Sequence, residues 1–548
     1  MHRMTRAAGS AEIDAPFDAG ASLRFKADTA RLERRGAERF LRIESPRGRA
    51  LFRVTKVIGG HHREDFAGVE VPSADAPPAI ADEQILPVSF LRASGTLRYK
   101  GYSVMLRERP YLQAGPAWSK TCIFCHNTSP YLSSLLGALV GRGGRKYQGA
   151  IVDAMLPRDR AWRYEIADSG ALDDALADEL RALGGAVAAT GRARIAQTIE
   201  ATRDRFGEPH LVEIGIGCES CHGGARAHAA DPSVKPSYAP RASFLRITPP
   251  PTDAQATTHV CARCHQVLFS RYPWTWEGGR RNEDAGGSHI NSGEGRDFLL
   301  GGCASAMTCT ACHDPHVPDG SARLRDVESI AGNGICLGCH AKYRGDDALR
   351  AHAHHDPRGE AGVCIRCHMP KKNMTLDSKL GRYHRIGSPT DPIRVLRDRP
   401  LECALCHADK STESLVVTME TWWNKRYDRA LLRALYGDLG RPNLLPTLAS
   451  GKPHEQAVAL FVFGQRKERA AAALIARQTV NEYPLVREYA RAALDAALGR
   501  SCAIDLGTDA TTIETTARAC LTAAGMSAPN DVWVVAAPSD RELDPGED

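Results

Sequence analysis

The chain has no run of apolar residues long enough to cross a membrane. The longest near-candidate covers 131–140 and then meets Gly-Arg-Gly-Gly, which is about half of the ~20 residues that a spanning helix needs. The N-terminus carries basic residues but not the apolar segment of a secretion signal. We therefore expect no transmembrane segment, and no export signal is visible in this chain.

Aromatic residues are also scarce. They make up 6 % of the 548 residues, whereas apolar residues as a class make up 43 % and charged residues 25 %, as in ordinary globular proteins. The length predicts two to four domains. A core of this size with so few aromatic rings leaves room for another large apolar component.

Cysteine, in contrast, is abundant and almost confined to one pattern. Fourteen of the 17 Cys lie in seven copies of Cys-x-x-Cys-His. This is the attachment motif of c-type haem, in which two thiols form thioethers to the porphyrin and the His ligates the iron. A zinc site does not need a His after every second Cys, and a disulfide framework would scatter its Cys. We therefore expect seven covalently bound haem c groups, attached at Cys122 and Cys125, Cys218 and Cys221, Cys261 and Cys264, Cys309 and Cys312, Cys336 and Cys339, Cys364 and Cys367, and Cys403 and Cys406.

The His of each motif is the expected proximal iron ligand. Seven of the 20 His are used in this way, which leaves thirteen, against only nine Met, for the opposite side of the irons. A second His makes an electron carrier of low potential, Met raises the potential, and an open position admits substrate. We therefore expect His as the distal ligand at most sites. The proximal ligands are His126, His222, His265, His313, His340, His368 and His407.

The sequence context suggests several distal ligands without deciding among them. Each could instead be a surface residue or a partner of a haem propionate. The candidates are His316 in Cys-His-Asp-Pro-His, His228 after the second motif, His384 between the last two motifs, the cluster of His352, His354 and His355, His259 and His289 around the third motif, and His61 or His62 beside the N-terminal region.

The formal net charge of +6 does not predict nucleic-acid binding. A ferric bis-His haem with two propionates adds about −1, so seven such groups would bring the total to about −1. The excess of Arg and Lys is then expected to neutralise propionates.

The composition and the spacing of apolar residues along the sequence predict a mixed fold in four parts. Residues 1–118 form a β-rich domain with strands near 41–45 and 50–58 and again near 85–90 and 97–102, and 72–82 is a loop. Residues 119–425 form a loop-rich multihaem cytochrome c core with short helices at the motifs, apart from a helical piece at 171–206. Residues 426–500 form a helical, HEAT-like domain with helices at 429–436, 455–463, 467–477 and 484–498. In the tail, 501–548, Cys502 and Cys520 are expected to pair, and the acidic end from Ser539 is expected to lack structure.

Four runs resemble one known family. They are Gly217-Cys-Glu-Ser-Cys-His-Gly, Cys309-Thr-Ala-Cys-His-Asp-Pro-His, His352-Ala-His-His and Cys364-Ile-Arg-Cys-His-Met-Pro-Lys. They resemble the multihaem cytochrome c family related to the tetrahaem electron acceptor of hydroxylamine oxidoreductase. Its larger members have an N-terminal β region and C-terminal HEAT- or TPR-like helical repeats. The resemblance covers most of 119–425 and implies that His228, His316, His354 and His384 are distal ligands, whereas Cys303 and 272–276 depart from the family pattern.

These observations predict an extracytoplasmic heptahaem cytochrome that relays electrons between redox partners through mostly bis-His haems. Bacteria attach haem c outside the cytoplasm, which is why we expect a periplasmic or extracellular protein. One alternative is a multihaem reductase of a small nitrogen or sulfur oxyanion with one open iron, although the Lys-for-His motif of pentahaem nitrite reductases is absent. The other is a redox subunit of a larger complex or filament that docks through the C-terminal helices. No catalytic residue is assigned, and the expected partners are other redox proteins or cytochromes, with no nucleic acid.

Overall fold

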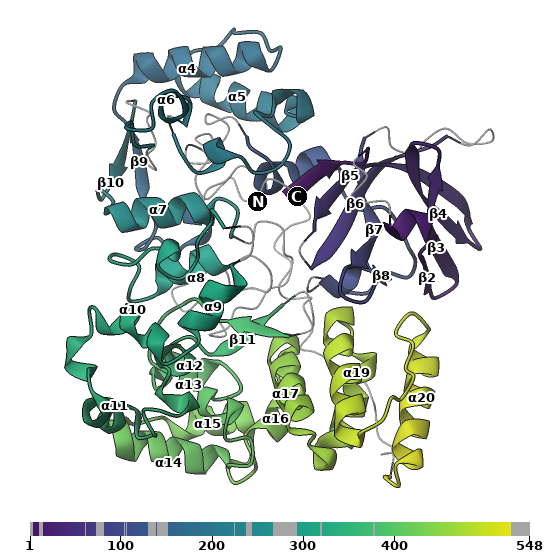
Figure 1. The fold of residues 1–548 in the computed structure, drawn as a ribbon, viewed down its shortest axis with the longest axis vertical. Helices are drawn as coiled ribbons and strands as arrows, with labels where there is room; N and C mark the ends of the chain where they lie inside the picture. The colour runs from purple at the N-terminus through teal and green to yellow at the C-terminus, as the bar shows by residue number, and fades with distance from the viewer. Residues whose placement is uncertain are drawn as a thin grey trace. The chain divides into compact units, whose positions relative to one another are not determined.

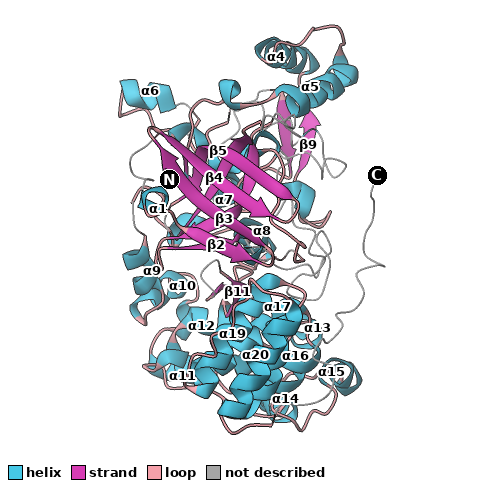
Figure 2. Ribbon diagram, turned by 90° about the vertical axis from the view of Figure 1, so that its right-hand side faces the viewer, coloured by secondary structure: helices cyan, strands magenta, loops and turns pink. Residues whose placement is uncertain are grey.

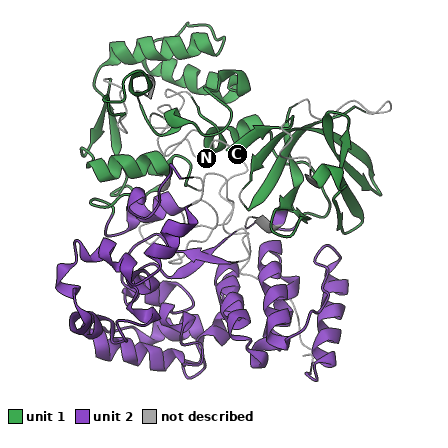
Figure 3. Cartoon of the chain, viewed as in Figure 1, with its two compact units in different colours: residues 1–100, 109–269, 304–308 green, residues 101–108, 270–303, 309–548 purple. Residues whose placement is uncertain are grey.

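The computed structural model forms two compact units, shown in different colours in Figure 3. Unit 1 comprises 1–100, 109–269 and 304–308, and unit 2 comprises 101–108, 270–303 and 309–548. The described residues are 4–9, 15–60, 62–72, 82–103, 105, 107–129, 139, 152–223, 225–236, 244–266, 293–317, 320–375 and 379–527. The expected loop at 72–82, the segment 272–276 and the acidic tail lie wholly or largely outside them.

Unit 1 begins with an eight-stranded antiparallel sheet. Alternating burial explains it, because every second side chain of a strand such as β3 faces the interior. The rings of Phe25 and Tyr99 stack 4.2 Å apart, so the first and last strands of the sheet path approach each other. The β-rich start that the sequence predicts is confirmed (Figures 1 and 2). The strands are β1 (Thr5–Ala7), β2 (Ser22–Phe25), β3 (Asp28–Arg35), β4 (Glu38–Ser45), β5 (Gly48–Gly59), β6 (Arg63–Glu70), β7 (Gln84–Leu91) and β8 (Thr96–Tyr99), in the order β2 to β8 with β1 paired to β5.

The rest of unit 1 is mainly helical. The helical piece expected at 171–206 consists of two helices. The buried residues that directly follow them, Leu183 and Phe206, pack with the sheet and with the first haem motif. The remaining elements are α1 (Ala15–Asp18), α2 (Ile123–His126), α4 (Ser169–Ala182), α5 (Gly191–Arg205), α6 (Ala225–Ala230), α7 (Asp253–Ala262) and the strand pair β9 (Arg163–Ile166) and β10 (Leu245–Thr248).

Unit 2 contains short helices around four motifs and longer helices after them. Helices α17 and α19 pack closely, because a Cβ atom on Gly464 would lie only 3.1 Å from Cα of Ala493. The region predicted to be helical is helical, and its assignment to HEAT repeats stays a prediction. The elements are α8 (Glu294–Leu300), α9 (Ser321–Val327), α10 (Gly334–Leu337), α11 (Asp346–Ala353), α12 (Cys364–His368), β11 (Lys371–Met374), β12 (Leu380–Arg382), α13 (Pro392–Arg397), α14 (Thr412–Trp423), α15 (Arg429–Tyr436), α16 (Leu444–Ser450), α17 (Pro453–Arg466), α18 (Ala472–Arg477), α19 (Pro484–Leu498) and α20 (Ala510–Ala523).

Covalent and ionic contacts hold these helices together. Cys502 and Cys520 form a disulfide with a Cα–Cα distance of 5.4 Å. Arg399 Nε lies 3.1 Å from the buried Glu455 carboxylate, and Lys372 pairs with the buried Asp398. Within the described part of the chain, no helix is both long and apolar enough to cross a lipid bilayer.

Candidate haem sites

Each of the seven motifs folds as one helical turn. In six of them the N–H of the His donates to the carbonyl of the first Cys at 2.8 to 3.1 Å. In the remaining one, Cys364–His368 is the helix α12 itself. Residues i, i+3 and i+4 of a helical turn lie on the same face. Both thiols and the imidazole of each motif therefore share one side of the backbone, as attachment and ligation by one motif require.

Three motifs belong to unit 1, and they are neighbours. The thiols of Cys125 and Cys264 share a hydrogen bond, which lowers the pKa of Cys264 to about 7 and raises that of Cys125. The charge of Cys264 also acts on Cys221. Thr128, just after the first motif, accepts a hydrogen bond at Oγ1 from the N–H of Gly217 at 2.7 Å, directly before the second motif. Sulfur atoms of three different motifs thus lie together.

Four motifs belong to unit 2, and motifs that follow each other in the sequence are also neighbours in space. Cys312 packs on the same small core as Ile335, the residue before the fifth motif. The thiols of Cys336 and Cys364 share a hydrogen bond, which lowers the pKa of Cys364 to about 7. The charge of Cys367 acts on Cys403, and that of Cys406 acts on Cys367, which links the sixth motif to the seventh. The fourth to seventh motifs therefore form a continuous series.

Three proximal His of unit 2 face a second imidazole ring. Two metal–imidazole bonds of about 2 Å on opposite sides of one iron, together with the radii of the two rings, place the ring centres about 6 Å apart. The observed separations fit this arrangement. They are 6.2 Å for His313 and His384, 5.9 Å for His368 and His352, and 6.0 Å for His407 and His355, with angles of 23°, 2° and 38° between the ring planes.

Backbone carbonyls set the tautomer of these rings. Nδ1 of His368 lies 2.9 Å from the Gly387 carbonyl, that of His384 lies 3.0 Å from the Arg382 carbonyl, and that of His355 lies 2.6 Å from the Ala353 carbonyl. A carbonyl only accepts, so Nδ1 carries the proton and Nε2 has the lone pair. This second hydrogen bond is typical of His that bind metal ions.

Burial also keeps several rings in the neutral form that binds iron. It lowers the pKa of His126 to about 4 and lowers the pKa values of His352, His368 and His407. In addition, Nδ1 of His126 is buried without a hydrogen-bond partner among the described residues. The residues present therefore fit the haem ligation that the motifs imply.

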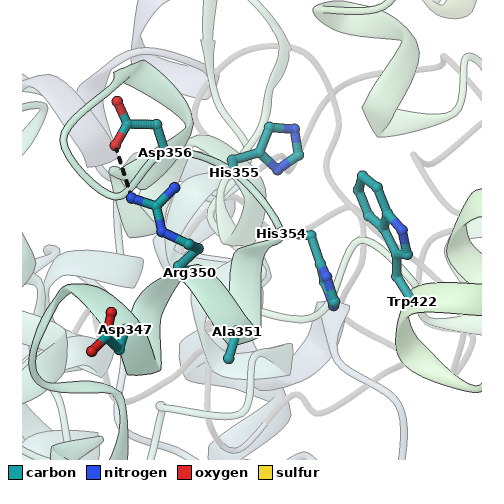
Figure 4. A pocket seen from close by; sticks show the side chains of 7 residues that line it. All are labelled: Asp347, Arg350, Ala351, His354, His355, Asp356 and Trp422. Carbon is teal, nitrogen blue, oxygen red and sulfur yellow. Dashed lines mark ion pairs between the residues drawn. The ribbon is translucent and has the colours of Figure 1, made fainter.

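His354, the ligand implied by the family resemblance, has different surroundings. It lies just after α11 with a φ of 55°, and its ring stacks on Trp422 with centres 4.8 Å apart. Figure 4 shows both side chains at a cavity of about 550 Å³, which His355 also lines. The ion pair of Arg350 and Asp356, at 3.7 Å, lies on the same cavity. The cavity beside His354 is therefore also bordered by the ring of His355, which faces His407.

The other candidate distal ligands have protein partners or lie outside the described residues. Nδ1 of His259 lies 2.9 Å from the Gln255 carbonyl, and its ring stacks on Trp162. His228 is exposed, with Nδ1 2.8 Å from the Val234 carbonyl. The side chain of His316 is 75 % exposed, 3.7 Å from the Asp314 carboxylate. His61 and His289 lie outside the described residues, and His62 is exposed.

The fifth motif has a different set of neighbours. The centre of the Tyr343 ring lies 6.5 Å from the centre of the His340 ring, on which it stacks, and 4.1 Å from the centre of the His352 ring. Burial raises the pKa of the Cys303 thiol, on which the charges of Cys336 and Cys339 also act. Cys303, which the sequence did not place, therefore lies near the fifth motif.

Sequence reasoning missed the residues that hold the ring of His352, which faces His368. Trp423 donates from Nε1 to the carbonyl of His352 at 2.9 Å, and Tyr343 packs on the ring of His352. The only available signal was the proximity of Trp422-Trp423 to the seventh motif in the sequence, which does not specify a contact with α11.

Comparison with known proteins supports the identification of the haem motifs. A family model described as a doubled CXXCH motif matches residues 303–345, which contain the fourth and fifth motifs. No curated protein and no solved structure matches the chain. The family match indicates a multihaem c-type cytochrome with covalently bound haem and a role in electron transfer.

Proposed function

We propose that this chain is an extracytoplasmic heptahaem cytochrome that relays electrons between redox partners. The observation that carries the proposal is the set of three facing imidazole pairs in unit 2, at 5.9 to 6.2 Å. Iron held by two His has no open position, so it exchanges electrons rather than binding substrate. When bound, each haem supplies a one-electron couple, and the protein sets its ligands, spacing and surroundings.

The ligand assignment within the proposal follows the facing rings. His384 serves the iron of His313, His352 that of His368, and His355 that of His407. The Nδ1 atoms of His384 and His355 are hydrogen-bonded to backbone carbonyls, which leaves Nε2 of each ring for iron and supports this assignment. The candidates His228, His259, His289, His316 and His61 or His62 remain available for the other irons.

The grouping of the motifs supports a relay within each unit. Thiols of different motifs are hydrogen-bonded between Cys125 and Cys264 and between Cys336 and Cys364. Porphyrins attached at such neighbouring sulfur atoms would lie close to each other. A series of closely spaced centres is what stepwise electron transfer needs.

The proposal is tested on the mature protein from a host that attaches haem c. Mass spectrometry should show the added mass of seven haems, and the double variant Cys364→Ser/Cys367→Ser should show six. Chemical reduction should then change the absorbance of all haems in the wild type. A colourless chain, or a mass without added haem, would refute the proposal.

A reductase is the second candidate, because one motif has a different neighbour. The ring stacked against His340 is that of Tyr343, a residue type that can deliver protons. An open iron at His340 would bind nitrite or hydroxylamine and change the absorbance spectrum. If neither ligand changes it and no iron is high-spin, the reductase fails and the electron carrier stands.

A further inference from the structure

A buried ionic cluster lies at β6 and at the end of β8 in unit 1. Arg63 Nη2 lies 2.9 Å from the Asp65 carboxylate, which also pairs with Lys100. Ser89 Oγ donates to Asp65 Oδ1 at 2.5 Å. Burial alone would raise the pKa of Asp65, but the charges of Arg63 and Lys100 outweigh it and hold that pKa well below its usual range. The Asp65 carboxylate is therefore ionised at neutral pH.

The cluster has two positive charges and one negative charge, and one donor is unused. The side chain of Arg63 is only 14 % exposed. Its Nη1 atom is buried and has no hydrogen-bond partner in the described part of the chain. A buried N–H group without an acceptor destabilises the protein, and a charged one does so more strongly. The cluster thus has both the charge and the donor to bind one more anion.

The first haem motif lies beside this cluster. The charges of Lys100, Asp65 and Arg63 all act on the thiol of Cys122 and on the imidazole of His126. Cys122 also packs on the buried residues of the sheet, among them Ala67 of β6. A haem attached here would bring its two propionate carboxylates into the neighbourhood of Arg63.

We propose that Arg63, held in place by Asp65 and assisted by the charge of Lys100, binds a propionate carboxylate of the haem attached at Cys122 and Cys125, with Arg63 Nη1 as a donor. This rests on the proposed function, because it needs a haem at the first motif. The guanidinium suits a carboxylate, since its N–H groups form a planar fork. The net positive charge also favours the electron that the iron gains, so the cluster raises the reduction potential of this haem.

The test is a potentiometric titration of the holoprotein with matched variants. Arg63→Met should lower the midpoint potential of one haem, and Arg63→Lys should restore part of the shift, because it keeps the charge but not the fork. Asp65→Asn should raise the same potential. This variant preserves the contact with Ser89 and tests the proposal even if Arg63→Met does not fold. Arg47→Met is the control, because Arg47 pairs with the buried Asp28 of the same sheet at 3.0 Å and contacts Tyr111 instead.

Two results would overturn the proposal. In the first, the variants retain the haem mass at the first motif but titrate as the wild type does. In the second, acetate or nitrite shifts the spectrum of the wild type but not of Arg63→Met, which assigns the cluster to a dissolved anion. A wild-type peptide containing Cys122 and Cys125 without haem would contradict the proposed function instead, and mass spectrometry of that peptide separates the two failures.

Discussion

Removal of one imidazole from the His cluster at the C-terminal end of α11 should open one particular iron. The change is His352→Ala, compared with His355→Ala and with His354→Gly. Glycine is chosen at 354 because the backbone there has a φ of 55°, which glycine adopts without strain. The three variants remove rings that lie within four residues of each other, so any general effect on this segment is shared.

The expected magnitude follows from the ring positions. His352 and His355 lie 5.9 and 6.0 Å from the rings of His368 and His407, close to the roughly 6 Å of two imidazoles on one iron. The ring of His354 instead stacks on Trp422 at 4.8 Å. We therefore expect one additional high-spin iron per chain in His352→Ala and in His355→Ala, and none in His354→Gly.

The assay is electron paramagnetic resonance of the oxidised protein, with the high-spin signal integrated against total haem. One iron per chain corresponds to one-seventh of the haem when all seven motifs are loaded. Azide or cyanide should bind the opened iron in the two Ala variants and leave His354→Gly unchanged. If His354→Gly alone gains the high-spin iron, the distal ligand is His354, as the family resemblance implies, and not His352 or His355.

Two further predictions concern the helical part of unit 2. Burial lowers the pKa of His454 to about 3 from 6.5, so between these values the unfolded chain binds a proton that the native helix does not. Stability should therefore fall by about 1.4 kcal/mol per pH unit as the pH decreases below about 6.5. Hydrogen exchange of the α17 amides at about pH 6.5 and pH 5, corrected for intrinsic rates, should show this slope, and His454→Leu should abolish it. For the disulfide, the double variant Cys502→Ser/Cys520→Ser should lose about 3 kcal/mol of unfolding free energy, because the bond closes a loop with a sequence separation of 18. Urea unfolding measures this loss, and a change under about 1 kcal/mol would contradict it.

The features that depend on neighbouring residues could be predicted from the sequence. The seven helical turns follow from five-residue motifs, and the strands β4 and β5 follow from apolar alternation around Pro46. The helix α15 has the predicted bounds, since its apolar residues recur every three to four positions. In all these cases, the residues that form the element lie close together in the sequence, up to Phe40 and Arg53 in the β4–β5 pair.

The facing imidazole pairs could not be predicted in this way. The turn from Cys309 to His313 places one ring of a pair, and the ring that faces it belongs to His384, which lies 71 positions after His313. The ionic cluster beside the first motif has the same origin. Arg63 and Lys100 are 37 positions apart, and both contact Asp65 because β6 and β8 are neighbours of the same strand, β7. The spacing of residues along the sequence does not show which residues of distant segments come into contact.

The backbone at His354 explains how one short segment can face two different haem motifs. Helix α11 ends at Ala353, so His352 still belongs to the helix, whereas His355 follows a residue in the left-handed conformation. This bend costs a non-glycine residue roughly 1 kcal/mol or more. Stacking of the His354 ring on Trp422 and the hydrogen bond from Trp423 to the His352 carbonyl offset that cost. The bend separates the directions of His352 and His355, so that one faces His368 and the other faces His407.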